Sequence, residues 1–213
     1  GLFTKNLNFM LLGFSRFQYR GNIYGFVYTR FVNNVNSFNR FSGKSIKSNN
    51  FGINGAEIDL SGIGYENSWV CLQIGRGREN WSAGKDIELA LSSQSNAYDY
   101  IKLSSDYGKI RVRYFHGFLE NIEGGYNRFI NGRGIEWSNK STYVIGLSEI
   151  IIYSGMNRHM DIGYLNPMLN HLEVEWNNRL NVNGEGSANA VWQISVDKKY
   201  RNFRFSMNYL IDE

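Results

Sequence analysis

The chain has 213 residues, of which 23 are glycine and one is proline, and its formal net charge is +4. So little proline argues against a Pro-rich linker, and the basic residues form no dense run, so nucleic-acid binding is not expected. The lone Cys71 excludes an internal disulfide or a cysteine metal cluster, and His116, His159 and His171 lack metal-ligand spacing, so neither a metal nor a cofactor is predicted.

Apolar and polar residues alternate with a period of two along the chain, which predicts strands. In chain order, the first two hairpins pair residues 7–19 with 23–33 and residues 56–65 with 69–76. Further strands are expected at 87–92, 98–105, 109–118, 128–137, 143–153, 171–180, 188–196 and 203–211. Short turns such as Asp106-Tyr107-Gly108 separate some of them, and longer loops fall at 34–54, 77–86, 121–127, 154–170 and 181–187.

The last two predicted strands show the alternation best. One face should carry apolar residues that contact lipid, namely Ala188, Ala190, Trp192, Ile194, Val196, Phe203, Phe205, Met207 and Tyr209. The other face should line a polar lumen with Gln193, Ser195, Asp197, Arg204, Ser206 and Asn208.

These features predict an all-β fold, an antiparallel up-and-down meander that forms a transmembrane β-barrel or a large part of one. Short turns at one rim and long loops at the other are typical of outer-membrane barrels. A soluble β-sandwich or jelly roll also alternates, but the predicted strands exceed the usual ~5–6 residues. We expect residues 1–213 to be a single barrel domain and an internal fragment of a longer barrel protein.

The loop after residue 75 suggests a sugar-binding site. It offers Arg78, Asn80 and Lys85 as hydrogen-bond donors and Trp81 as a stacking surface, and Arg158 and His159 are expected on the same outward rim. The alternative is a structural rim loop whose tryptophan lies at the membrane interface. The expected partners are therefore an acidic polysaccharide, for this loop, and outer-membrane lipid, for the apolar strand faces.

Two other kinds of function leave some trace in the sequence. Glu173 and Glu175 are two apart on a predicted strand and could form a glycosidase pair. Acidic residues that alternate on a polar strand face are ordinary in a barrel lumen, however, so no catalysis is expected. A pore would need an open lumen ringed by charge, for which the candidates are Arg111, Arg113, Glu173 and Arg204.

Several short motifs occur in an order that resembles the Wzi-type capsule assembly family of outer-membrane barrels. They are Ile74-Gly75-Arg76, Trp81-Ser82-Ala83-Gly84, Leu89-Ala90-Leu91-Ser92-Ser93, Gly146-Leu147-Ser148-Glu149, Ile152-Tyr153-Ser154-Gly155, Leu165-Asn166-Pro167 and Tyr209-Leu210-Ile211-Asp212-Glu213. The resemblance covers roughly residues 57–213. It implies a non-catalytic outer-membrane barrel that binds capsular or other surface polysaccharide and helps anchor or organise it at the cell surface. The alternatives are a porin-like channel or a barrel enzyme acting on lipid or sugar.

Overall fold

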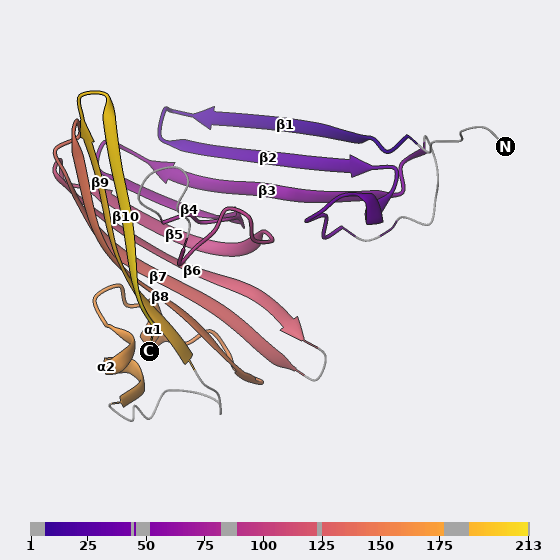
Figure 1. Cartoon of the computed structure of the whole chain (residues 1–213). Helices are drawn as coiled ribbons and strands as arrows, with labels where there is room; N and C mark the ends of the chain where they lie inside the picture. The colour runs from indigo at the N-terminus through magenta and orange to yellow at the C-terminus, as the bar shows by residue number, and fades with distance from the viewer. Residues whose placement is uncertain are drawn as a thin grey trace.

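The computed structural model describes residues 7–43, 45, 52–81, 89–122, 125–176 and 188–212. Across these residues, ten strands form one antiparallel sheet in which each strand pairs with its neighbours in the chain (Figure 1). The predicted meander is therefore confirmed. β1 (Met10–Tyr19) and β10 (Phe203–Asp212) lie at the two ends of the strand order, and the sheet is not closed into a barrel.

The other elements follow in chain order. The strands are β2 (Ile23–Val32), β3 (Gly55–Glu66), β4 (Val70–Gly77), β5 (Tyr98–Asp106), β6 (Ile110–Ile122), β7 (Tyr126–Ser138), β8 (Tyr143–Met156) and β9 (Ala188–Tyr200). A short 3-10 turn, η1 (Val35–Ser37), follows β2, and two short helices, α1 (Ile162–Leu165) and α2 (His171–Trp176), lie between β8 and β9.

Two of the predicted strands are wrong. Residues 171–176 form α2, whose first turn begins with the Asn170 side chain accepting a hydrogen bond from the Glu173 backbone N–H at 2.8 Å. The described part of 87–92, residues 89–92, is a bend followed by a turn in which the Ser95 N–H donates to the Ser92 carbonyl. Alternation by itself does not separate a strand from a helix or turn in these segments, and their contacts with the distant Glu149 and Gln193 decide the backbone.

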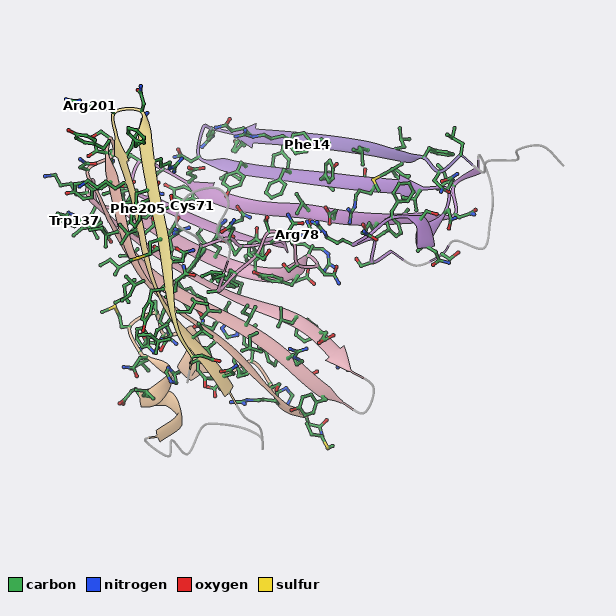
Figure 2. The ribbon with its side chains drawn as sticks, viewed as in Figure 1. Phe14, Cys71, Arg78, Trp137, Arg201 and Phe205 are labelled. Carbon is green, nitrogen blue, oxygen red and sulfur yellow. The ribbon has the colours of Figure 1, made fainter. Side chains whose placement is uncertain are left out.

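The connections fall at opposite ends of the sheet, as predicted. Short turns join β1 to β2, β3 to β4, β5 to β6, β7 to β8 and β9 to β10, all at one end. Figure 2 labels Arg201 in the last of these turns and Trp137 near another, both at that end. The other four connections lie at the opposite end of the sheet. Three of them are long, and the one between β6 and β7 is short.

Strand register divides the side chains between two faces of the curled sheet. One register row runs through Arg113, Gly134, Ser148 and Gln193, and we call the face that carries these side chains the inner face. The neighbouring row, Val112, Ile135, Leu147 and Ile194, belongs to the outer face. The residues predicted to alternate on β9 and β10 do separate onto these two faces, because partners across a ladder lie on the same side.

Aromatic rings pack flat on the inner face where glycines leave room for them. The buried inner cluster contains Trp81, Tyr98, Phe115, Ile130 and Ile150, among others. The rings of Trp81 and Phe115 meet edge to face, with centroids 5.2 Å apart. A Cβ at Gly132 would overlap the Phe115 ring, so this position needs glycine for a close approach.

Gly132→Ala is therefore expected to destabilise the protein by ~1–3 kcal/mol, the usual cost of overpacking a filled core. The measurement is the midpoint of denaturant unfolding. Gly77→Ala is the matched control, because its added Cβ would meet the Tyr100 ring at 3.2 Å, a contact that a small shift relieves. Equal stability losses in the two variants would contradict the packing argument.

Candidate functional site

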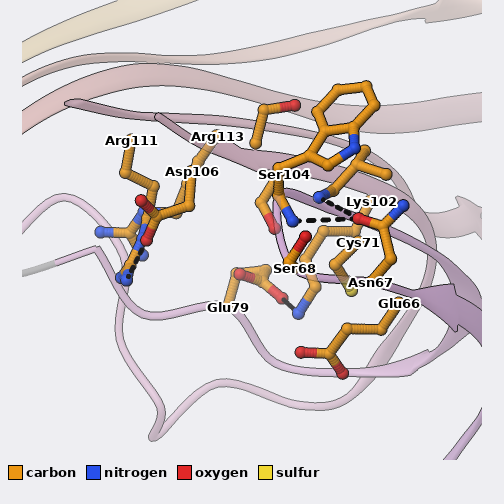
Figure 3. A pocket seen from close by; sticks show the side chains of 13 residues that line it. Glu66, Asn67, Ser68, Cys71, Glu79, Lys102, Ser104, Asp106, Arg111 and Arg113 are labelled. Carbon is orange, nitrogen blue, oxygen red and sulfur yellow. Dashed lines mark hydrogen bonds and ion pairs between the residues drawn. The ribbon is translucent and has the colours of Figure 1, made fainter. Parts of the chain in front are cut away.

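A polar cavity of about 310 Å³ opens on the inner face beside the turns that join β3 to β4 and β5 to β6 (Figure 3). Its lining comes from four neighbouring strands and from the segment that follows β4. The lining residues are Glu66, Asn67, Ser68, Trp69, Val70, Cys71, Glu79, Lys102, Ser104, Ser105, Asp106, Arg111 and Arg113.

The β3–β4 turn is held by Asn67 and presents a tryptophan beside this cavity. The Asn67 side-chain oxygen accepts hydrogen bonds from the backbone N–H groups of Trp69 and Val70, at 3.0 and 2.8 Å. Trp69 is 51% exposed, and its ring centroid lies 6.5 Å from that of Tyr107. The turn thus supplies an accessible aromatic surface of the kind on which a sugar ring can stack.

Cations and carboxylates alternate around the cavity. Arg111 Nη2 lies 3.3 Å from Asp106 Oδ2, and Lys102 Nζ lies 2.9 Å from Glu79 Oε1. Arg113 pairs with Glu136 of β7. The cavity therefore offers donors and acceptors side by side, and the Arg111 side chain remains 52% exposed. Such a lining suits a ligand rich in hydroxyl groups, with Arg111 available to a carboxylate.

The segment after β4 folds back onto the inner face and fills part of the curve. Trp81 is 3% exposed, and the Arg113 guanidinium carbon lies 5.2 Å from the centroid of its ring. The Gln193 side chain donates to the Trp81 carbonyl and accepts from the Ala90 N–H at 3.3 Å. These bonds tie both described ends of the loop to β9, so Trp81 acts as a packed internal residue here and not as a rim surface.

The structure describes five of the six residues predicted to bind sugar, and these five follow two different strands, β4 and β8. Arg78 donates to both oxygens of Asp59, at 3.1 and 2.6 Å, and to the Ser95 carbonyl at 2.6 Å. Asn80 is half-buried beside the buried Trp81, and Lys85 lies outside the described residues. The remaining two, Arg158 and His159, lie beyond β8, where Arg158 is buried and His159 exposed. Their role in sugar binding stays a prediction.

A second polar cluster lies on the outer face, beneath the segment formed by residues 157–173, which we call the covering segment. Glu149 of β8 is 1% exposed, with Arg133 Nε at 2.8 Å and His171 Nδ1 at 2.6 Å from its carboxylate oxygens. The Tyr164 carbonyl accepts hydrogen bonds from Tyr114 and from Asn131, at 3.1 and 3.0 Å. The cluster therefore attaches the covering segment to the sheet.

His116 and Tyr153 extend this cluster, with His116 Nε2 and the Tyr153 hydroxyl 2.7 Å apart. The Tyr153 ring stacks on Tyr164, with ring centroids 4.5 Å apart, and the Arg158 guanidinium carbon lies 4.8 Å from the Tyr153 centroid. The sequence carried one signal for this cluster: polar residues such as Asn131 and Arg133 interrupt an otherwise apolar strand face.

The strand spacing considered for Glu173 and Glu175 is wrong, because both residues belong to α2 and not to a strand. Glu173 also does not join the charges of the inner face, since α2 is attached through His171 to Glu149 on the outer face. Within the described residues, no three His, Cys, Asp or Glu side chains are grouped so as to hold a metal ion.

The described helices include none long and apolar enough to span a membrane. No protein-family model, curated protein or solved structure matches this chain.

Proposed function

We propose that this chain forms part of the wall of a bacterial outer-membrane β-barrel and that the barrel binds and organises surface polysaccharide without catalysing a reaction. The observation that carries the membrane part is a belt of exposed apolar side chains on the outer face, next to the short turns. It includes Tyr19, Ile23, Ile63, Tyr65, Leu72, Ile74, Ile101, Ile110, Val112, Ile135, Trp137, Ile145, Leu147, Ile194, Phe203, Phe205, Met207 and Tyr209.

This belt crosses all of the described strands. A water-soluble monomer rarely exposes an apolar patch of more than a few hundred Å², whereas a barrel wall in lipid requires one. Tyrosines and tryptophans gather where the belt meets the short turns, among them Tyr107, Trp137 and Tyr200. Such rings favour the boundary between membrane and water, which supports placing the short-turn end at one interface.

The polysaccharide part of the proposal is supported by the inner-face cavity and by the motif resemblance to the Wzi-type family. Hydroxyl-rich chains satisfy donors and acceptors together, and Trp69 provides a stacking surface beside them. Arg111 is the side chain best placed to meet a sugar carboxylate, because half of it is exposed.

Arg111→Ala is expected to weaken binding of an acidic capsular polysaccharide by about tenfold or more, the value of a hydrogen bond to a charged group. Binding would be measured by calorimetry on the detergent-solubilised protein. Arg16→Ala is the control, an exposed arginine on β1 away from the cavity, and it should bind as the wild type does. Equal binding by all three proteins would place the site elsewhere, and no binding by the wild type would refute the polysaccharide role.

A porin-like pore is the second candidate, favoured by the charges that line the inner face, including Arg111, Arg113, Glu136 and Arg204. The packed segment around Trp81 argues against it, because that segment occupies the inside of the curve. Conductance across a planar bilayer separates the two. A steady open-channel current without polysaccharide binding would favour the pore.

A further inference from the structure

A second cavity, of about 490 Å³, opens on the outer face between β3, β4, β5, β6 and the start of the covering segment. Apolar side chains form most of its wall: Ile58, Ile74, Ile101, Phe118 and Met160. Ile58, Ile74, Ile101 and Met160 are each between 37% and 57% exposed, so the strands leave this hollow unfilled.

One cationic side chain, that of Arg76, lines this hollow. Arg76 lines it together with Asp99, and Arg76 Nη1 lies 3.3 Å from Asp99 Oδ1. Both side chains retain access to solvent, 31% for Arg76 and 64% for Asp99. The pair lies two positions beyond Ile74 and Ile101 along the strands, on the side away from the short turns, so it marks where the apolar belt ends on β4 and β5.

The position of the hollow on the apolar outer face indicates which kind of ligand could fill it. It lies on the same face as the apolar belt and is continuous with it through Ile74 and Ile101. If that face contacts the membrane, as the proposed function holds, the side of the hollow formed by Ile74 and Ile101 opens to acyl chains, and Arg76 lies near the level of the head groups. An exposed guanidinium at that level is suited to a phosphate oxygen, which it can bind in a bidentate manner.

We propose that this outer-face hollow binds an anionic phospholipid, with one acyl chain against Ile74 and Ile101 and the phosphate at Arg76. This inference rests on the membrane placement in the proposed function and adds a lipid site to it. Asp99 holds the Arg76 side chain beside the hollow, and its high exposure leaves the pair weak enough for a phosphate to share the guanidinium.

The test is native mass spectrometry of the protein released from vesicles that contain phosphatidylcholine and phosphatidylglycerol in equal amounts. The wild type should retain phosphatidylglycerol in preference to phosphatidylcholine. Ile101→Trp, which fills the hollow, should lose both lipids, and Arg76→Ala should lose the preference while keeping some lipid. The controls are Leu147→Trp, on the same face outside the hollow, and Arg204→Ala, a paired arginine on the inner face; both should behave as the wild type.

The outcomes separate the two proposals. Unchanged lipid retention by Ile101→Trp would overturn the lipid site, and an unchanged preference in Arg76→Ala would overturn the role of the guanidinium. In both cases the membrane placement would stand if the protein still sediments with the vesicles. A protein that neither sediments with vesicles nor retains lipid would overturn the membrane placement and the lipid site together.

Discussion

Glu149→Ala is expected to cost roughly 3–5 kcal/mol of unfolding free energy, the loss typical of removing one partner from a buried ion pair. Glu149 is 1% exposed and is the carboxylate that both Arg133 and His171 approach. Its removal would leave the buried Arg133 guanidinium without a counter-charge. Because His171 also loses its partner, the covering segment should detach from the sheet along with the loss of stability.

The measurement is guanidinium unfolding in detergent, with proteolysis as a readout of the covering segment. Glu149→Gln tests the charge separately, because an amide oxygen can still accept from His171 while the ion pair with Arg133 is lost. Glu120→Ala is the matched control, an exposed carboxylate paired with Arg128, and should cost no more than ~1 kcal/mol. If Glu149→Ala is as mild as Glu120→Ala, the cluster does not hold the segment.

The sheet could be predicted from the sequence because its signal is local. Alternation along β9 and β10 assigns each side chain to a face without any knowledge of what lies across the sheet, and turn residues such as Gly108, whose φ is +82°, mark where strands reverse. The pairing inside each hairpin followed from the short turns, since strands joined by a tight turn pair with each other.

The packed loops could not be predicted in the same way, because their contacts join residues far apart in the chain. Trp81 looked like an exposed interface residue, yet its carbonyl is bound by Gln193, 112 positions later. His171 continued an alternating pattern, but its place is set by Glu149 on another strand. Neither partner is visible from local sequence, and in each segment tertiary contacts decide the outcome over a short pattern.

The apolar belt on the outer face predicts a second large effect, a loss of stability when a charge is placed on it. Ile194→Arg should destabilise the protein folded in lipid bilayers by ~2–4 kcal/mol, the cost of an arginine near the membrane midplane on a lipid-facing strand. Ile194 belongs to the outer-face row with Leu147 and Tyr209 and is 37% exposed. It lies in the middle of β9 (Ala188–Tyr200), away from the β9–β10 turn. In water the same exposed position would accept an arginine at little cost.

Reversible guanidinium unfolding from lipid vesicles measures this cost, and Asn208→Arg supplies the comparison. Asn208 lies on the adjacent strand one residue from the Ile194 row but on the inner face, where a polar lumen should tolerate the charge. Repeating both substitutions in a short-chain detergent should shrink the difference, because a micelle deforms around a charge more easily than a bilayer does. Equal costs for the two variants in vesicles would mean that the outer face does not contact lipid, and the barrel-wall proposal would then fail.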